Sequence, residues 1–182
     1  LIEVVVENDL VLITDEIYDH ILYDGREHIY LGGIETIKDR TITVSGLSKT
    51  YAITGWRLGY VIAPTALSAA IRPVHDFMTV CAPTPLQVAA VTALNLPQFY
   101  YDQMTADYHV RRDTILGILT ELGFQTPPIE GAYYVLADYS GVPIPQAEFS
   151  QPSCRAPASK WFCTRTGSSD IAGCIIALIS VA

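Results

Sequence analysis

The sequence predicts an α/β fold, in which a mostly parallel sheet with flanking helices is followed by the start of a smaller α+β domain. Three strand-length runs predict the sheet, namely the apolar run at residues 10–14, the β-branched run at residues 40–45 and the run at residues 56–63. The first run, L-V-L-I-T, is apolar without alternation, which is typical of a strand covered on both faces in a parallel sheet. Polar residues follow the first two runs directly, and ligands bind at the carboxyl ends of strands in open α/β sheets.

Helical patterns flank these strands. Residues 2–6 predict the end of a helix. Thr65 predicts the N-terminal cap of a helix over residues 66–74, and residues 86–96 predict an apolar helix. The predicted strands and helices therefore alternate along the first part of the chain.

A long helix and one further strand follow. Pro97 opens the helix, Ile115 and Leu119 share one of its faces, and Gly123 predicts its left-handed end. Residues 131–138 predict a strand beyond this helix, in the smaller domain.

The composition is that of a globular protein. Hydrophobic residues make up 50% and charged residues 16% of the 182 residues, so we do not expect disorder. A formal net charge of −8 argues against nucleic acid or an anionic membrane as a partner. The apolar run at residues 171–182 is shorter than the ~20 residues that span a bilayer. No glycine motif for nucleotides and no G-x-S-x-G nucleophile motif is present.

The four cysteines and four histidines are scattered, without C-x-x-C or H-x-x-x-H spacing. This pattern predicts neither a disulfide framework nor a metal site, and it fits a reducing, cytoplasmic setting. The chain starts at Leu1 rather than at methionine, which we interpret as a fragment.

Three motifs occur in a fixed order along residues 1–146. Residues 15–18 read D-E-I-Y, residues 45–60 read S-G-L-S-K-T-Y-A-I-T-G-W-R-L-G-Y, and residues 130–134 read E-G-A-Y-Y. Together they resemble the class I/II aminotransferases, which are fold-type I enzymes that depend on pyridoxal 5'-phosphate. The resemblance implies that residues 1–96 are the C-terminal part of the cofactor-binding large domain. Residues 97–146 are then a linking helix and the start of the small domain.

The resemblance implies a role for each matching side chain. Lys49 matches the lysine that forms a Schiff base with the cofactor aldehyde and then acts as general base and acid. Asp15 matches the aspartate that pairs with the pyridine nitrogen, and Tyr18 matches the tyrosine that hydrogen-bonds the phenolate oxygen of the ring.

Phosphate binding is implied for three further residues. Arg57 matches the arginine that binds the cofactor phosphate, since a guanidinium suits phosphate geometry. Ser45 and Ser48 are candidate hydroxyl donors. Many family members carry a serine three residues before the lysine, where this chain has Gly46, so Ser48 is the better candidate.

The implied function is pyridoxal-phosphate-dependent transfer of an amino group between an amino acid and a 2-oxo acid, by a homodimer when full length. The upstream asparagine and phosphate loop of the family are absent, as is the C-terminal arginine that binds the substrate carboxylate. We interpret residues 147–182 as an atypical tail from a shifted reading frame or chimeric end, with a divergent tail as the alternative. The chain alone is therefore expected to be inactive.

Three alternatives remain open. The first is a C–S lyase or synthase of the same superfamily, and the second is an aminotransferase-like ligand-sensing domain of a transcription regulator. The third is a non-functional gene remnant. Product analysis separates lyase from transferase, and a DNA-binding helix-turn-helix upstream of Leu1 would indicate the regulator.

Overall fold

The computed structural model describes residues 1–138, 163–164 and 174–177. The chain divides into two compact units. The first comprises Leu1–His20 and Glu27–Gln103, and the second comprises Ile21–Arg26 and Met104–Ala182. Most of the predicted tail at residues 147–182 lies outside the described residues, and the predicted domain limits stay a prediction.

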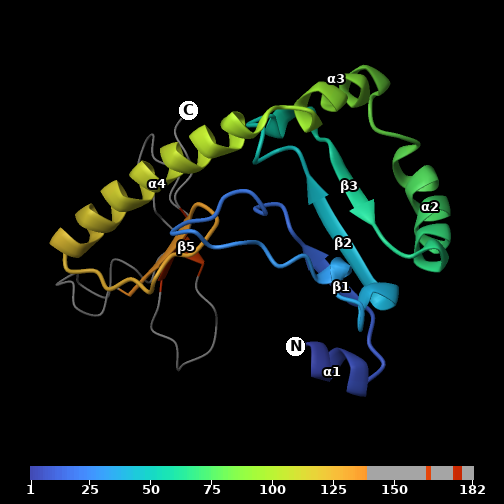
Figure 1. The fold of residues 1–182 in the computed structure, drawn as a ribbon, viewed down its shortest axis with the longest axis horizontal. Helices are drawn as coiled ribbons and strands as arrows, with labels where there is room; N and C mark the ends of the chain where they lie inside the picture. The colour runs from blue at the N-terminus through green and yellow to red at the C-terminus, as the bar shows by residue number, and fades with distance from the viewer. Residues whose placement is uncertain (139–162, 165–173, 178–182) are drawn as a thin grey trace. The chain divides into compact units, whose positions relative to one another are not determined.

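The first unit is built on a three-stranded sheet with the order β1-β2-β3, in which β2 lies between its neighbours (Figure 1). β1 (Leu12–Asp15) runs parallel to β2 (Thr41–Gly46), and β3 (Gly59–Ile62) runs antiparallel to β2. The α/β class and the three predicted strands are confirmed. The described sheet is mixed, because residues 47–58 contain no crossover α-helix, which a parallel neighbour would require.

The predicted helices are also present, with shifted ends. α1 is Ile2–Glu7 and α3 is Thr84–Leu94, and α4 (Gln98–Glu121) begins directly after Pro97. Three short 3-10 helices lie in the loops, namely η1 (Leu31–Gly33), η2 (Lys38–Arg40) and η3 (Thr54–Trp56).

The N-terminal cap predicted at Thr65 is wrong. α2 spans Thr65–Thr79, so Thr65 is its first residue, and Pro64 at the cap position makes no side-chain cap. The helix also continues past residue 74 and contains Pro73. A proline removes only its own N–H donor, and later donors keep their partners, as when the N–H of Val80 donates to the carbonyl of Asp76 at 3.1 Å.

A hydrophobic core of the first unit packs against the two ends of the loop that follows β2. Leu47, Leu58 and Ala90 are buried there, at 5%, 6% and 7% exposure. Partly buried apolar residues surround them, namely Tyr51, Ile53, Ala82, Leu86 and Ala93. This packing fixes the start and the end of the loop that carries Lys49, because Leu47 precedes Lys49 and Leu58 begins the return to the sheet.

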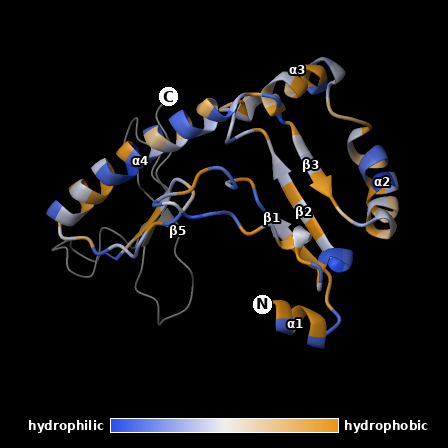
Figure 2. Cartoon of the chain, viewed as in Figure 1, coloured by the Kyte–Doolittle hydropathy of each residue, from blue (hydrophilic) through white to orange (hydrophobic). Residues whose placement is uncertain are grey.

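Several apolar residues of the sheet are exposed. The continuous run at residues 10–14 was expected to be covered on both faces, but β1 alternates in burial and Ile13 is 67% exposed. All four residues of β3 are exposed, including Ile62 at 64%. Figure 2 shows the apolar colouring of β3. Strands of this composition are typical of sheets covered by further layers, so this surface is available for burial.

The second unit combines α4 with a three-stranded antiparallel sheet of order β4-β6-β5. The strands are β4 (Tyr134–Ala137), β5 (Cys163–Thr164) and β6 (Cys174–Ala177). Leu119 of α4 packs with Val135 and Ala137 of β4 in its core. The predicted helix end is confirmed, because Gly123 has a φ of +85° and the N–H of Phe124 donates back to the carbonyl of Leu119 at 2.9 Å.

Residues 21–26 are held within the second unit by Arg112 of α4. Its side chain is 10% exposed, its guanidinium lies 4.6 Å from the ring centroid of Tyr23, and it donates to both carboxylate oxygens of Asp24. The Nε2 of His109 lies 2.9 Å from the Oδ1 of Asp24. The hydrogen bond from Arg112, and then that from His109, lowers the pKa of Asp24 to about 2. The hydroxyl of Tyr23 donates to the carbonyl of Ala132 at 2.7 Å.

Gly46→Ala is expected to destabilise the first unit. A Cβ at this position would lie 2.8 Å from the carbonyl oxygen of Leu58 and 3.2 Å from the Cα of Gly59, so the two strands would have to separate. The expected loss is about 1–3 kcal/mol in the free energy of unfolding, measured by urea denaturation. Gly55→Ala is the matched control, because its Cβ meets no atom within 4 Å. Equal losses in both variants would show that the close approach does not matter.

Asp24→Asn is expected to change how stability depends on pH. The folded-state pKa of Asp24 is about 2, below the ordinary value of 3.8, so its carboxylate stabilises the fold above about pH 4. This contribution is lost as the pH falls from about 4 through 2. The difference in unfolding free energy between the wild type and the variant should therefore shrink over that range. Urea titrations at several pH values measure it, with Asp76→Asn on α2 as a control for the loss of one charge. A difference that stays constant down to pH 2 would contradict the assignment.

Candidate active site

The strand directions bring the predicted site residues to one edge of the sheet. β1 and β2 are parallel, so Asp15 at the end of β1 and the loop after Gly46 leave the sheet at the same edge. β3 is antiparallel and pairs Gly59 with Gly46, so Arg57 also approaches this edge. The three segments are far apart in sequence, and their common position is the main geometric feature of the site. In open α/β sheets the carboxyl edge is where ligands bind.

Asp15 is exposed and controls the turn that follows it. Its Oδ1 accepts a hydrogen bond from the N–H of Ile17 at 3.2 Å, which orients the carboxylate. Alternation along β1 places Asp15 on the face opposite Thr14 and Glu16. The carboxylate is therefore held in one direction by its own turn and remains accessible to a ligand.

Lys49 and Tyr18 lie near each other. The Nζ of Lys49 is 6.0 Å from the centroid of the Tyr18 ring, and both side chains are half-buried. The structure thus brings together one residue from each of two separate motifs. Lys49 is half-buried, so part of its side chain is accessible from solvent.

The loop around Lys49 is held through its neighbours. The N–H of Ala52 donates to the carbonyl of Lys49 at 3.3 Å, and the hydroxyl of Thr54 donates to the carbonyl of Ser48 at 3.0 Å. Thr50 is buried, and its carbonyl accepts a hydrogen bond from the hydroxyl of Tyr100 at 2.9 Å. The backbone on both sides of Lys49 is therefore fixed.

Arg57 is exposed and adopts a left-handed backbone conformation with a φ of +55°. Its Nη1 donates to the carbonyl of Thr54 at 3.2 Å, so the guanidinium lies over its own 3-10 turn. Among the contacts of the described residues, none joins Arg57 to Asp15, Tyr18 or Lys49. A guanidinium has five N–H donors, so this single bond leaves donors for an anion.

The two candidate serines differ in their surroundings. Ser45 is buried at 6% exposure, and its hydroxyl donates to the carbonyl of Glu16 at 3.2 Å. Its hydrogen is therefore used to join β2 to the turn after β1. Ser48 is half-buried, and the only contact described for it is through its backbone carbonyl. This difference favours Ser48 over Ser45 as a hydroxyl donor to a ligand.

Two ionisable residues beside the predicted site were missed in the sequence. Glu16 is 6% exposed, and its Oε2 lies 3.1 Å from the Nε2 of His28. Asp19 is 9% exposed, and burial raises its pKa, an effect that His20 and His28 oppose. Glu16 directly follows an apolar strand in the sequence. This position could have indicated a carboxylate at the end of a buried element.

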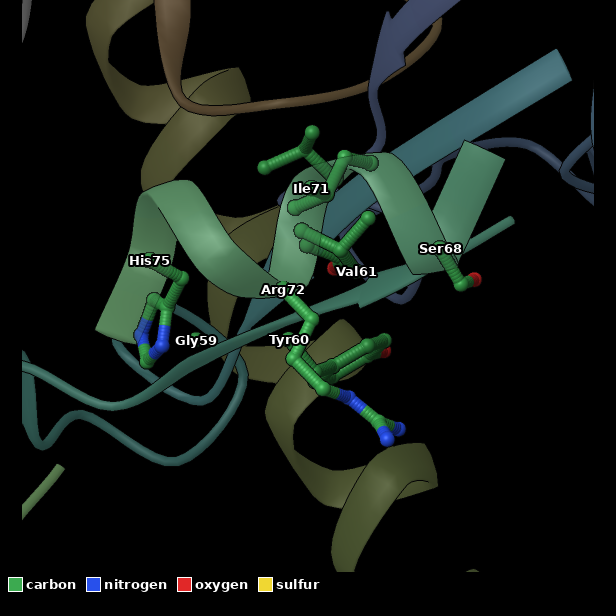
Figure 3. Close-up of a pocket in the computed structure, with 9 residues that line it drawn as sticks. Gly59, Tyr60, Val61, Ser68, Ile71, Arg72 and His75 are labelled. Atoms are coloured by element: carbon green, nitrogen blue, oxygen red, sulfur yellow. The ribbon is translucent and has the colours of Figure 1, made fainter. Parts of the chain in front are cut away.

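A separate cavity of about 470 Å³ lies between the sheet and α2 (Figure 3). It is lined by Tyr60 and Val61 of β3 and by Arg72 and His75 of α2. Of the predicted site residues, only Ser45 is in its lining. This cavity is therefore distinct from the sheet edge that carries Asp15 and Lys49.

Two further searches cover only the described part of the chain. Over those residues, no cluster of three or more metal-binding side chains is found. Over the same residues, no helix combines the length and the apolar character needed to cross a membrane.

The chain is similar to known proteins of one family over most of its length. The family profile described as "Aminotransferase class I and II" matches residues 1–163. Methionine aminotransferase of Escherichia coli is 34% identical over 145 residues, covering 79% of this chain and 38% of that protein. Aspartate aminotransferase of Pyrococcus abyssi is 35% identical over 148 residues, covering 80% of this chain and 38% of that protein. The chain thus spans less than two fifths of the length of these relatives.

Solved structures agree with the sequence matches. N-succinyldiaminopimelate aminotransferase from Mycobacterium tuberculosis superposes with a TM-score of 0.76 at 32% identity, covering 81% of this chain and 38% of that one. Aspartate aminotransferase from Rhizobium meliloti superposes with a TM-score of 0.74 at 36% identity, covering 78% and 36%. By profile, sequence and fold together, the chain belongs to the class I and II aminotransferase family.

Proposed function

We propose that the protein carrying this chain is a pyridoxal-phosphate-dependent aminotransferase that moves an amino group between an amino acid and a 2-oxo acid. The observation that carries the proposal is that the segments with Asp15, Tyr18 and Lys49 leave the sheet at one edge, with the Nζ of Lys49 6.0 Å from the centroid of the Tyr18 ring. Family membership supports the same activity. The relatives are named for different substrates, including methionine and aspartate, so the proposal stops at the substrate class.

The chemistry of these side chains fits the cofactor. Lys49 offers a primary amine for an aldehyde, Asp15 a carboxylate for a protonated pyridine nitrogen, and Tyr18 a hydroxyl for a phenolic oxygen. Arg57 and Ser48 offer a guanidinium and a hydroxyl for a phosphate. When bound, the cofactor supplies an electron sink for the electrons released at the α-carbon of the substrate.

Lys49 has two tasks in this proposal. Its amine would hold the cofactor, and its Nζ would take the proton from the α-carbon of the substrate and return one. Lys49 is half-buried, which suits an amine that the substrate amine must replace and that must then remain close to the α-carbon of the substrate. The hydrogen-bonded backbone from Ser48 to Thr50 fixes the Cα from which this side chain extends.

The other side chains set the charge around the cofactor. Asp15 would keep a proton on the ring nitrogen, since a nearby carboxylate favours the protonated form. Tyr18 would donate to the phenolic oxygen. Arg57 would bind the phosphate with the donors that its bond to Thr54 leaves, and Ser48 would add a hydroxyl.

The proposal includes a homodimer in the cytoplasm. The scattered cysteines fit a reducing setting. The exposed apolar residues of β1 and β3 fit burial by further parts of a larger assembly.

Borohydride reduction is expected to trap the cofactor on Lys49. The intact protein is incubated with pyridoxal phosphate, reduced and digested, and the label is located by mass spectrometry. Lys49→Ala should lose the label and lower the transamination rate by about 10²–10⁴-fold, the usual contribution of a general base. Lys38→Ala is the matched control, because Lys38 pairs with Glu35 at the surface. Label on Lys38 or Lys160 instead would overturn the assignment.

Product analysis is expected to separate the transferase from its lyase alternative. The intact protein is supplied with a panel of amino acids and 2-oxo acids, and both products are quantified by chromatography. A transferase forms one new amino acid for each 2-oxo acid released. Release of ammonia with a 2-oxo acid, without a new amino acid, would indicate a C–S lyase and refute the proposed reaction.

A further inference from the structure

Glu16 is a buried carboxylate directly between two residues of the proposed site. Its Oε1 accepts a hydrogen bond from the hydroxyl of Thr14 at 3.0 Å, and its Oε2 lies 3.1 Å from the Nε2 of His28. Both carboxylate oxygens thus have partners. An unpaired buried carboxylate is costly, so these two contacts keep Glu16 in place.

The backbone of Glu16 is fixed as well. Its N–H donates to the carbonyl of Val44 at 2.8 Å, and its carbonyl accepts from the hydroxyl of Ser45 at 3.2 Å and from the N–H of Asp19 at 3.2 Å. Residue 16 is therefore held to β2 and to its own turn. The side chain and the main chain of one residue together anchor the end of β1.

His28 is positioned from the other side. Its side chain is 23% exposed, and its ring meets that of Tyr30 edge to face, with 4.6 Å between the centroids. Asp19 and His20 are the other ionisable groups at this turn, with the Oδ2 of Asp19 3.9 Å from the Nε2 of His20. His28 thus reaches the buried carboxylate from a separate segment of the chain.

This arrangement controls the direction of two proposed cofactor contacts. Asp15 is the residue before Glu16 and points to the opposite face, and Tyr18 lies two residues after it. A rotation of the backbone at Glu16 would move both side chains. The residues on either side of Glu16, Asp15 and Ile17, are exposed and half-buried, so Glu16 is the buried member of this part of the turn.

We propose that Glu16 and His28 are a positioning pair that sets the orientation of Asp15 and Tyr18 toward the cofactor ring. The inference rests on the proposed function, because it assigns the pair to the same site. Neither residue of the pair needs to touch the cofactor. Their effect passes through the turn that they hold.

The test compares His28→Phe with His28→Gln in the intact protein. Phenylalanine keeps a ring against Tyr30 but removes the N–H donor, while glutamine keeps a donor for Glu16. His75→Phe is the matched control, because His75 is an exposed residue of α2 outside the turn that holds Glu16. The readouts are the dissociation constant for pyridoxal phosphate, the pH midpoint of the visible absorbance of the bound cofactor, and the urea midpoint.

His28→Phe is expected to shift the absorbance midpoint by about 0.5 pH unit or more and to weaken cofactor binding on the order of tenfold, and His28→Gln to restore much of both. Thr14→Val removes the other partner of the carboxylate at nearly constant volume. It should shift the same midpoint, and it tests the pair if His28→Phe does not fold.

Two outcomes count against the inference in different ways. A lower urea midpoint with an unchanged absorbance midpoint and cofactor affinity would show a purely structural role, and would overturn the positioning pair alone. A wild-type protein that binds no pyridoxal phosphate and gives no borohydride label would overturn the proposed function, and the positioning pair with it.

Discussion

The parallel pairing of β1 with β2 is the constraint on which the rest of the site depends. The register runs from Leu12 opposite Thr41 to Asp15 opposite Val44. A slip of one residue would turn every side chain of β1 to the other face and put Glu16 where Asp15 now lies. The proposed assignment of one carboxylate to the cofactor and the other to the interior therefore depends on this register.

The polar groups of the site are divided by burial into two kinds. Asp15 and Arg57 are exposed and Lys49 is half-buried, while Glu16 and Ser45 are buried and bonded within the protein. The buried groups contribute rigidity, and the accessible ones are those to which the proposed function assigns the chemistry. Such support behind ligand-binding side chains is what keeps a site in productive geometry.

Hydrophobic runs predicted the strands and the long helix, because these elements depend on local pattern. The candidate site residues come from the resemblance of three motifs to a known family, and their roles stay a prediction. The antiparallel direction of β3 could not be read in the same way, since an apolar run does not state its direction. The role of Gly46 also depends on a distant atom, the carbonyl of Leu58. The contact between Glu16 and His28 was missed for the same reason, because the two residues are twelve positions apart in the sequence.

The exposed apolar side chains of the sheet affect how the isolated chain would behave in solution. The side chains of Ile13 and Ile62 expose apolar surface to water. Neighbouring copies of the chain can bury this surface by associating with one another. Light scattering or size-exclusion chromatography on the chain alone would then detect this self-association. A dimer seen under those conditions would not by itself represent the assembly of the intact protein.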